Sequence, residues 1–444
     1  MKKTLFAVIA LIAAVAVFVA LPWFLGREVE ARFKDAVEGL SRPGSFRVKV
    51  TEYKRGVFSS EARVEVTVEV SNLALASVFA VVPEFQKYTG YTIYNTIHHG
   101  PWPMAGTFTG ESSPFFALGV MDSAIYFKDP PFLFSNYFGD SSIATARTSI
   151  GLTGDARLRL IGTPLSYTAP DGMLLIGWKG FDGKLALEGE KITGGLTGEG
   201  LDFAIEGNSF SIAPYSALFD YFLLPSGVLA GTHEIEAGGM TMVVESKKIY
   251  EITGIKVKDT STVEGDLLAQ EHKTSVEKAE VIGSLYGPAE LSFRFKNIDY
   301  RARSSLLDSL QRGAPLIQSI LQQGNYFMLA NFDFLDDAGK QALGAILSRS
   351  PEFEIPELSV VTPQGKLLAK VKARYNGGGE TPENVLALMA ELDVDWEARI
   401  PVALATEMKM KKSVYFVTEG GDYVIRGEMR KRNITVNGKN VFSM

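Results

Sequence analysis

Apolar and polar residues alternate along most of this chain. The alternation is strict in Phe46–Val50 and Ala62–Val70, and a period of two residues is typical of a strand with one buried face. Lys54, Arg55 and Gly56 supply a turn between the two segments. They are therefore predicted to form a hairpin.

The same alternation of apolar and polar residues continues to the C-terminal part of the chain. Turns such as Asp171-Gly172 and Asp182-Gly183 separate the segments, and consecutive strands joined by short turns pair antiparallel. The pattern predicts an extended, curved antiparallel β-sheet. Its further strands are Ala156–Ile161, Met173–Trp178, Lys184–Leu187, Leu201–Ile205, Met240–Val244, Ile255–Val257, Leu291–Phe295, Leu358–Val361, Leu367–Ala373, Ala390–Ile400, Val414–Val417, Tyr423–Met429 and Ile434–Val436.

Three segments have helical spacing instead. Ser304–Gln323 is predicted as a helix interrupted around Gly313–Pro315, and Ala338–Ser348 as a second helix capped by Asp336-Asp337. A third, short helix is predicted from the apolar residues Val29, Phe33, Val37 and Leu40. The predicted fold class is therefore mainly β with some α (α+β), with a few helices packed on the sheet.

The N-terminal segment predicts a membrane anchor. Leu5 to Leu25 is a run of 21 residues without a charge, and at about 1.5 Å per residue a helix of this length spans the roughly 30 Å of hydrocarbon in a bilayer. A cleaved signal peptide is the alternative, because Ala14-Val15-Ala16 resembles a cleavage site. The apolar run continues beyond it to Trp23, at an interfacial position, which favours the anchor.

The predicted organisation has three parts. Residues 1–26 form a transmembrane signal-anchor with its N-terminus in the cytoplasm, and residues 27–42 form a juxtamembrane helical stem. Residues 43–444 form one β-rich periplasmic domain, in which 265–300 is the weakest candidate for an internal boundary. The predicted location is therefore the bacterial inner membrane, crossed once, with the bulk of the chain in the periplasm.

The amino-acid composition argues against several classes of function. The apolar content of 46% in 444 residues supports a sizeable core, and the net charge of −6 without a basic cluster argues against a nucleic acid partner. The chain has no cysteine, which excludes disulfides, thiolate metal sites and cysteine nucleophiles and suits an oxidising compartment.

Candidate chemical sites all have simpler structural interpretations. His98-His99 is the only histidine pair and is favoured as a turn element before Gly100, because no third metal ligand accompanies it. Gly194–Gly200 lacks the Gly-Lys-Ser/Thr ending of a phosphate loop and is favoured as a turn or bulge. The chain contains Glu391, Asp393, Asp395 and Glu397, which alternate with apolar residues and are favoured as a solvated strand face over a calcium site.

No catalytic signature is recognisable in the sequence. We find no Gly-x-Ser-x-Gly elbow, and four histidines are too few for a convincing triad. We therefore predict a protein that is not an enzyme and holds no cofactor or metal.

An aromatic block stands out between Phe85 and Phe138, with fourteen aromatic residues in 54. Core packing is the favoured interpretation; an apolar groove or partner surface and contact with the membrane surface are the alternatives. The residues singled out for a groove or interface are Phe85, Tyr88, Tyr91, Tyr94, Trp102, Phe115 and Phe116.

Five short motifs resemble the YdgA-like (YdgA/YihF) family of bacterial envelope proteins. They occur in the family's order at Tyr53–Ser60, His99–Pro103, Ile150–Asp155, Ile400–Glu407 and Ile434–Gly438. The motif residues, favoured as structural, are Tyr53, Arg55, Gly56, Phe58, Ser59, His99, Gly100, Pro101, Gly154, Asp155, Pro401, Asn437 and Gly438.

The resemblance implies an inner-membrane protein with its bulk in the periplasm, and it brings no catalytic residues. The long run of amphipathic strands also resembles that of AsmA-like periplasmic proteins. The leading hypothesis is a membrane-tethered binding module whose apolar concave side or helix-covered groove holds a lipid or other apolar envelope component. The alternatives are an envelope scaffold that binds a protein partner or its own copies and, less favoured, a hydrolase.

Overall fold

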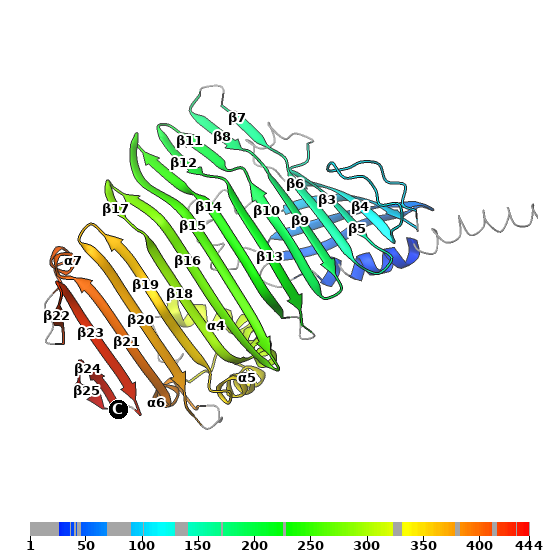
Figure 1. The fold of residues 1–444 in the computed structure, drawn as a ribbon. Helices are drawn as coiled ribbons and strands as arrows, with labels where there is room; N and C mark the ends of the chain where they lie inside the picture. Colours follow the sequence, from blue (N-terminus) through cyan, green and yellow to red (C-terminus); the bar gives the residue numbers. More distant parts are fainter. Residues whose placement is uncertain are drawn as a thin grey trace, which may run out of the picture. The chain divides into compact units, whose positions relative to one another are not determined.

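The computed structural model divides the chain into two compact units, Met1–Glu206 (unit 1) and Gly207–Met444 (unit 2). The predicted candidate boundary at 265–300 falls inside unit 2. Both units are mainly β, with open antiparallel sheets (Figure 1). The structure describes residues 26–35, 37–39, 41, 46–68, 90–100, 102–128, 141–169, 172–224, 228–322, 331–377, 382–410, 415–431 and 433–443.

The sheet of unit 1 follows the alternation in its sequence. Its strands are β1 (Phe46–Arg55), β2 (Ser59–Val68), β3 (Gly90–His99), β4 (Gly119–Phe127), β5 (Ala144–Ile150), β6 (Ala156–Gly162), β7 (Leu165–Thr168), β8 (Leu174–Trp178), β9 (Phe181–Glu188), β10 (Lys191–Gly198) and β11 (Leu201–Ile205). The antiparallel order is β1-β2-β3-β4-β5-β6-β9-β10, and β7-β8-β11 pair in a second set. The predicted first hairpin, β1–β2, is confirmed.

The predicted stem helix is present over residues 26–35 and 37–39. Val37 packs with Val48 of β1 and Val64 of β2, and Phe33 lies against the same cluster. Each Å² of apolar surface that these contacts bury contributes about 25 cal/mol of stabilising free energy. The contacts therefore fix the helix on one face of β1–β3. It is a covering element of the sheet.

Unit 2 is a meander of longer strands. They are β12 (Asn208–Ile212), β13 (Tyr215–Leu223), β14 (Leu229–Val244), β15 (Lys247–Glu264), β16 (Leu267–Val281), β17 (Ser284–Tyr286), β18 (Ala289–Asp299), β19 (Glu352–Thr362), β20 (Gly365–Tyr375), β21 (Leu392–Pro401), β22 (Val417–Glu419), β23 (Asp422–Arg430), β24 (Asn433–Val436) and β25 (Lys439–Ser443). The order β13-β14-β15-β16-β18-β19-β20-β21-β23-β24-β25 is antiparallel throughout.

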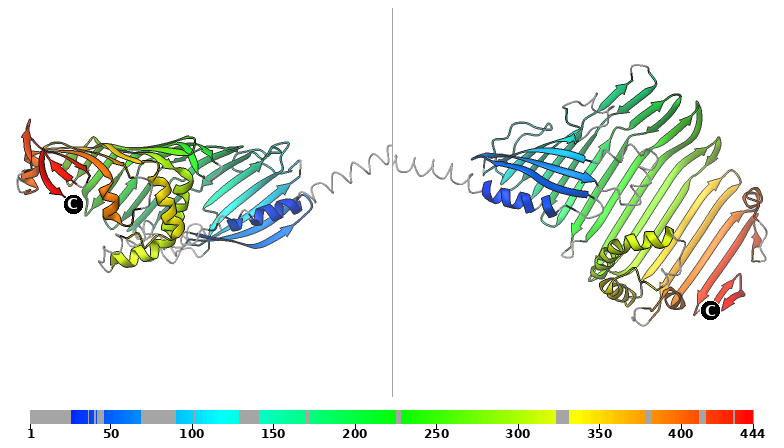
Figure 2. Two further views of the ribbon diagram at one scale, coloured as in Figure 1. Left: turned by 90° about the horizontal axis from the view of Figure 1, so that it is seen from below. Right: turned by 180° about the vertical axis from the view of Figure 1, so that it is seen from behind.

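Helices interrupt the meander of unit 2. They are α4 (Tyr300–Gln322), α5 (Asp337–Leu347), α6 (Val385–Ala390) and α7 (Val402–Glu407). Figure 2 shows α4 and α5 on one side of the unit 2 sheet. Asp336 caps α5 as predicted, accepting a hydrogen bond from the Gly339 amide at 2.8 Å. The predicted break in α4 is wrong, because the helix continues through Pro315.

Three local predictions are corrected. Asp182-Gly183 lies inside β9 and forms no turn, because β9 pairs with β6 and β10 on both sides. The glycine run from Gly194 is likewise part of β10, up to Gly198. Glu391 lies before β21, as the C-terminal cap of α6, so the predicted strand begins later than expected.

The predicted anchor, Leu5–Leu25, lies outside the described residues. Within the described part of the chain, no helix combines the length and the apolar character needed to cross a bilayer.

Candidate functional site

The sheet of unit 2 has two chemically different faces. Residues paired directly across antiparallel strands share a face. One row of such pairs crosses from β14 to β23 and is almost entirely aliphatic, and none of its members is fully buried. The row is Ile235, Val257, Thr274, Leu291, Leu358, Ala369, Ala398 and Ile425. We call this side the apolar face.

A neighbouring row extends the apolar face toward the C-terminal strands. Ile355 pairs with Val371, which pairs with Trp396 on β21. The Trp396 ring lies over Gly427 of β23, where a Cβ would come within 2.0 Å of it. Glycine is therefore required there to make room for the indole.

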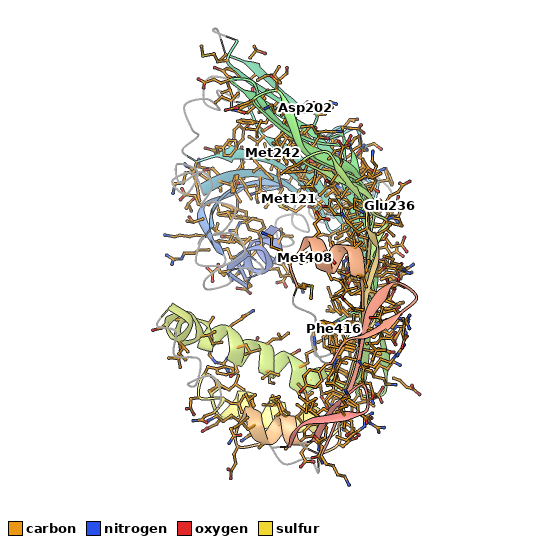
Figure 3. The ribbon with its side chains drawn as sticks, turned by 90° about the vertical axis from the view of Figure 1, so that its left-hand side faces the viewer. Met121, Asp202, Glu236, Met242, Met408 and Phe416 are labelled. Atoms are coloured by element: carbon orange, nitrogen blue, oxygen red, sulfur yellow. The ribbon has the colours of Figure 1, made fainter. Side chains whose placement is uncertain are left out.

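The opposite side, the charged face, carries ion pairs between neighbouring strands. Glu236 pairs with Lys256 at 2.9 Å, and Lys273 pairs with Glu290 at 3.0 Å. Figure 3 views the strands edge-on, with Glu236 on the side away from α4. Exposed pairs of this kind contribute little stability, but they keep this face solvated and direct apolar contacts to the other one.

Part of the apolar face is covered. Tyr300, the first residue of α4, packs with Leu268 of β16 and Val228 in the main buried cluster of unit 2. Farther along the strands the apolar side chains remain accessible, with Ile235 38% and Leu358 40% exposed.

A polar chain crosses the apolar face beside these residues. Both His233 of β14 and His272 of β16 contact Asp259 of β15 at 2.7 Å, through His233 Nε2 and His272 Nδ1. The Tyr221 hydroxyl and the Thr274 hydroxyl contact the remaining imidazole nitrogens. Because a carboxylate can only accept, each imidazole N–H donates to Asp259, and each hydroxyl is hydrogen-bonded with the other ring nitrogen.

This polar chain lines a pocket of about 260 Å³. Phe293 stacks on His272 with ring centroids 4.5 Å apart, and Phe295 completes the wall. Burial, with the nearby Asp259 carboxylate as the smaller cause, raises the pKa of Tyr221, so the phenol stays protonated and remains a donor. The arrangement places hydrogen-bonding groups next to an aromatic, apolar surface.

Asp393, Asp395 and Glu397 of β21 lie on the charged face. Asp395 contacts Arg430 at 2.6 Å, and Glu397 contacts Arg399 at 2.6 Å. Within the ranges that the structure describes, no three acidic or histidine side chains are arranged to hold a metal ion.

In unit 1 the structure brings three of the five motifs together at one end of the sheet. The His99 amide donates to the Phe58 carbonyl at 3.0 Å, and the Leu118 amide donates to the Ile150 carbonyl at 2.8 Å. The turn at 56–58, the segment 102–118 and the turn at 151–155 therefore lie along one edge, which we call the tip edge.

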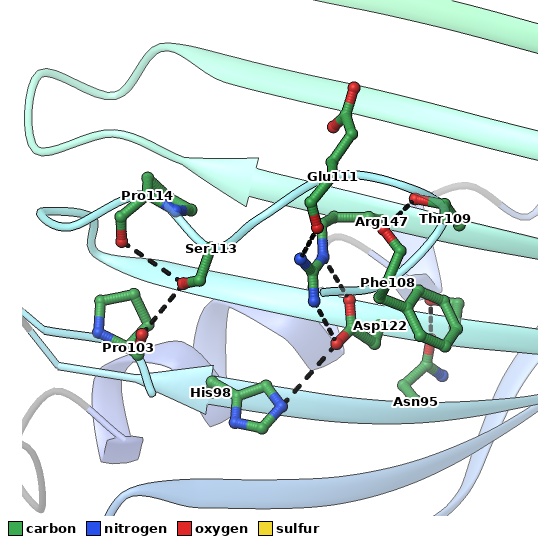
Figure 4. A network of polar contacts seen from close by, with 11 residues as sticks. Asn95, His98, Pro103, Phe108, Thr109, Glu111, Ser113, Pro114, Asp122 and Arg147 are labelled. Atoms are coloured by element: carbon green, nitrogen blue, oxygen red, sulfur yellow. Dashed lines mark hydrogen bonds and ion pairs between the residues drawn. The ribbon is translucent and has the colours of Figure 1, made fainter. Parts of the chain in front are cut away.

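A buried ion pair lies beneath segment 102–118 (Figure 4). Arg147 of β5 binds both carboxylate oxygens of Asp122 on β4, at 2.7 and 2.8 Å, and its side chain is only 2% exposed. His98 Nε2 lies 3.9 Å from the same carboxylate. Burial lowers the pKa of His98, against the raising effect of Asp122, and Arg147 lowers it further.

Segment 102–118 is held over this pair by its own turn. Phe108 and Glu111 exchange backbone hydrogen bonds, and Thr109 and Gly110 both have positive φ, 52° and 77°. Arg147 Nη1 donates to the Glu111 carbonyl, and its guanidinium lies 5.8 Å from the Phe108 ring centroid. The guanidinium thus binds the turn to the sheet.

His99 points to the other face of β3, as expected for neighbouring residues in a strand. It is 1% exposed, and its Nε2 lies 3.1 Å from the Ser60 hydroxyl. Gly26, the first described residue of the helix, lies directly against the ring: a Cβ there would be 2.6 Å from His99 Cε1. The start of the helix is therefore fixed at the tip edge.

The other motif residues of the tip edge shape turns. Gly56 is required because a Cβ would lie 2.5 Å from the Ser59 carbonyl oxygen, and Gly100 and Gly154 have positive φ, 113° and 91°. Arg55 contacts Glu30 of the helix at 3.4 Å, and Asp155 accepts a hydrogen bond from Thr153 at 2.8 Å. Pro101 lies outside the described residues.

Tyr53 holds the helix to β1. Its ring lies 6.0 Å from that of Phe33, and Lys34 lies 5.4 Å from its centroid. Burial raises the pKa of the Tyr53 hydroxyl.

The remaining two motifs lie in unit 2. Asn437 and Gly438, with φ of 46° and 75°, form the turn between β24 and β25, and two successive positive φ values are typical of a type I′ turn. The Asn437 side chain also accepts from the Arg426 amide at 2.9 Å and donates to the Tyr415 carbonyl at 2.6 Å. Pro401 ends β21 and precedes α7.

The aromatic block divides between the sheet and the tip edge. Tyr91 and Tyr94 of β3 contact Phe127 and Tyr126 of β4, at 5.7 and 5.5 Å between centroids. The other described residues named for a groove or interface, Trp102, Phe115 and Phe116, form an exposed cluster in segment 102–118. Phe85 and Tyr88 lie outside the described residues.

The residues that define both polar sites escaped the sequence analysis. Asp122 and Arg147 come from two strands, and His233, Asp259 and His272 come from three. One signal was present in the sequence: Asp259 lies on the same side of β15 as Val257 and Val263, where the alternation predicts an apolar residue. Only the register shows that these positions coincide.

The open, two-faced antiparallel sheet defines a mainly β protein with an accessible apolar surface. The model of a family described as "Bacterial protein of unknown function (DUF945)" matches residues 1–410, and the chain belongs to this family. It is 24% identical over 434 residues to Protein YdgA of Escherichia coli (strain K12), across 92% of this chain and 83% of that protein. The resemblance indicated by the five motifs is thus confirmed. No solved structure is significantly similar to the chain.

Proposed function

We propose that this protein is a non-enzymatic binding module, tethered to the bacterial inner membrane by Leu5–Leu25 and lying in the periplasm. Its apolar face in unit 2 holds a lipid or another apolar component of the envelope. The observation that supports the proposal is the partly exposed, mostly aliphatic row from Ile235 to Ile425, on a sheet whose other face carries ion pairs.

An acyl chain fits the energetics of this face. Each methylene moved from water into an apolar environment gains about 0.8 kcal/mol, and a long flat row of aliphatic side chains lets many methylenes be covered at once. The polar chain around Asp259 supplies hydrogen-bonding groups beside the same row. A ligand with an apolar chain and a polar end would therefore find both of its parts matched.

The test places one charge on each face of the sheet. Ile235 of β14 lies on the apolar face and is 38% exposed, whereas Leu218 of β13 pairs with Glu234 on the charged face and is 59% exposed. We expect the full-length chain, purified in mild detergent, to carry a co-purifying lipid in native mass spectrometry. Ile235→Lys should lose most of this lipid, because a buried ammonium without a partner is costly, and Leu218→Lys should retain it.

Two results would contradict the proposal. One is wild-type protein that repeatedly shows only the delipidated mass, also after lipid extraction. The other is equal lipid loss in both variants. If the lipid-free wild-type chain is instead a dimer that Ile235→Lys dissociates, the apolar face is a protein interface and the envelope-scaffold function replaces lipid binding.

A further inference from the structure

The tip edge of unit 1 exposes a cluster of large apolar side chains. Phe115 is 77% exposed and packs edge-on against Phe116, with centroids 4.6 Å apart. Trp102 lies 6.1 Å from Phe116. Val57 and Phe58 in the turn at 56–58 are exposed as well, and so are Ile150 and Leu152 at the turn at 151–155. Clusters of this kind on a single edge mark contact surfaces.

The helix of unit 1 begins at this same edge. Gly26 rests on the His99 ring at the end of β3, and β3 ends where segment 102–118 begins. The 21 uncharged residues Leu5–Leu25 directly precede Gly26 in the sequence. No linker separates the predicted anchor from the helix that is fixed at the tip edge.

We propose that the tip edge docks on the surface of the bilayer that holds the anchor, with Trp102, Phe115, Phe116 and Leu152 in its interfacial layer. The inference rests on the proposed tether. A helix that begins at the end of a membrane span keeps the tip edge within a few ångströms of the lipid headgroups, where aromatic side chains partition favourably. The tethered unit 1 is then held in one orientation.

The absence of cysteine allows a direct test. Single cysteines are introduced into the full-length chain at Phe115→Cys and Leu152→Cys, and at Met173→Cys as the control, because Met173 is 55% exposed in the turn before β8, away from the tip edge. Each is labelled with an NBD fluorophore and reconstituted in vesicles of phosphatidylethanolamine and phosphatidylglycerol, with or without a doxyl-labelled lipid. Flotation of the vesicles reports the tether separately.

We expect the chain to float with the vesicles. The NBD groups at positions 115 and 152 should be blue-shifted and quenched by the doxyl lipid at least twofold more than the one at position 173. Flotation with equal, weak quenching at all three positions overturns the docking and leaves the tether intact. Failure to float overturns the tether and the docking with it.

Discussion

The sheets of the two units differ in what covers them. In unit 1 the helix that carries Phe33 and Val37 packs on one face of β1–β3, and segment 102–118 lies over Arg147 on the other face. In unit 2 the row from Ile235 to Ile425 stays partly exposed. A covered face contributes stability, whereas an accessible apolar face remains available for another molecule. The comparison predicts that substitutions in unit 1 mainly affect folding and substitutions on the apolar face mainly affect binding.

The largest expected effect breaks the covered site of unit 1. Arg147→Met leaves the Asp122 carboxylate buried without its partner, and such losses cost about 3–5 kcal/mol. The matched control is Arg157→Met in β6, because Arg157 is 76% exposed and lies 3.9 Å from an exposed glutamate; a pair of this kind contributes about 0–1 kcal/mol. Urea unfolding of both full-length variants, followed by circular dichroism, measures the difference.

A double variant separates the effect of the unpaired Asp122 charge from the effect of losing the Arg147 side chain. Adding Asp122→Leu to Arg147→Met removes the unpaired carboxylate, so part of the lost stability should return. If Arg147→Met unfolds no more easily than Arg157→Met, segment 102–118 does not depend on the guanidinium, and that face of unit 1 is as open as the apolar face of unit 2.

The next effect compares a covered and an accessible leucine within unit 2. Leu268 is fully buried beneath Tyr300, so Leu268→Ala should cost about 2–5 kcal/mol. Leu358 is 40% exposed on the apolar face, and Leu358→Ala should cost roughly 1 kcal/mol because its side chain is only partly removed from water. Urea midpoints give both values.

The same pair of variants sharpens the binding proposal. Lipid occupancy in native mass spectrometry should fall in Leu358→Ala and persist in whatever fraction of Leu268→Ala stays folded. A Leu358→Ala chain that is as destabilised as Leu268→Ala would mean that the apolar face is already covered and cannot hold a ligand.

The sequence predicts the fold far better than the site. Period-two alternation identifies the hairpin of β1 and β2, and Asp336 is recognisable as a helix cap, because both signals are local. The break predicted at Pro315 is wrong because tertiary context can override the helix-breaking tendency of proline. The turn predicted at Asp182-Gly183 failed because a central strand tolerates glycine when its neighbours supply the pairing.

The faces of the sheet depend on register, which the sequence leaves open. Ile355 and Leu358, three positions apart in β19, lie on the same face only because the register with β20 shifts between them. His233 and His272, 39 positions apart in the chain, likewise meet at Asp259 through two strand registers. The aromatic block is visible in the sequence, but its division between aromatic pairs on the sheet and the exposed cluster of segment 102–118 follows from where β3 ends.

The smallest expected effect is on the pH dependence of stability. It tests how well segment 102–118 excludes water from His98 and Arg147. Burial lowers the pKa of His98 below its usual 6.5, and Arg147 adds to this, while Asp122 opposes it. The unfolded chain therefore binds a proton at His98 before the folded chain does. The stability contributed by neutral His98 is complete above about pH 6.5 and is lost as the pH falls below that value toward the lowered pKa.

His98→Gln removes this titration and keeps a hydrogen-bonding side chain. The urea midpoint of the wild-type chain should decline between pH 7 and pH 5 more steeply than that of His98→Gln, since the other three histidines are common to both proteins. Parallel declines would show that water reaches His98 freely, so that segment 102–118 does not seal its face of unit 1. A steeper decline in His98→Gln would mean that Asp122 dominates and holds His98 charged.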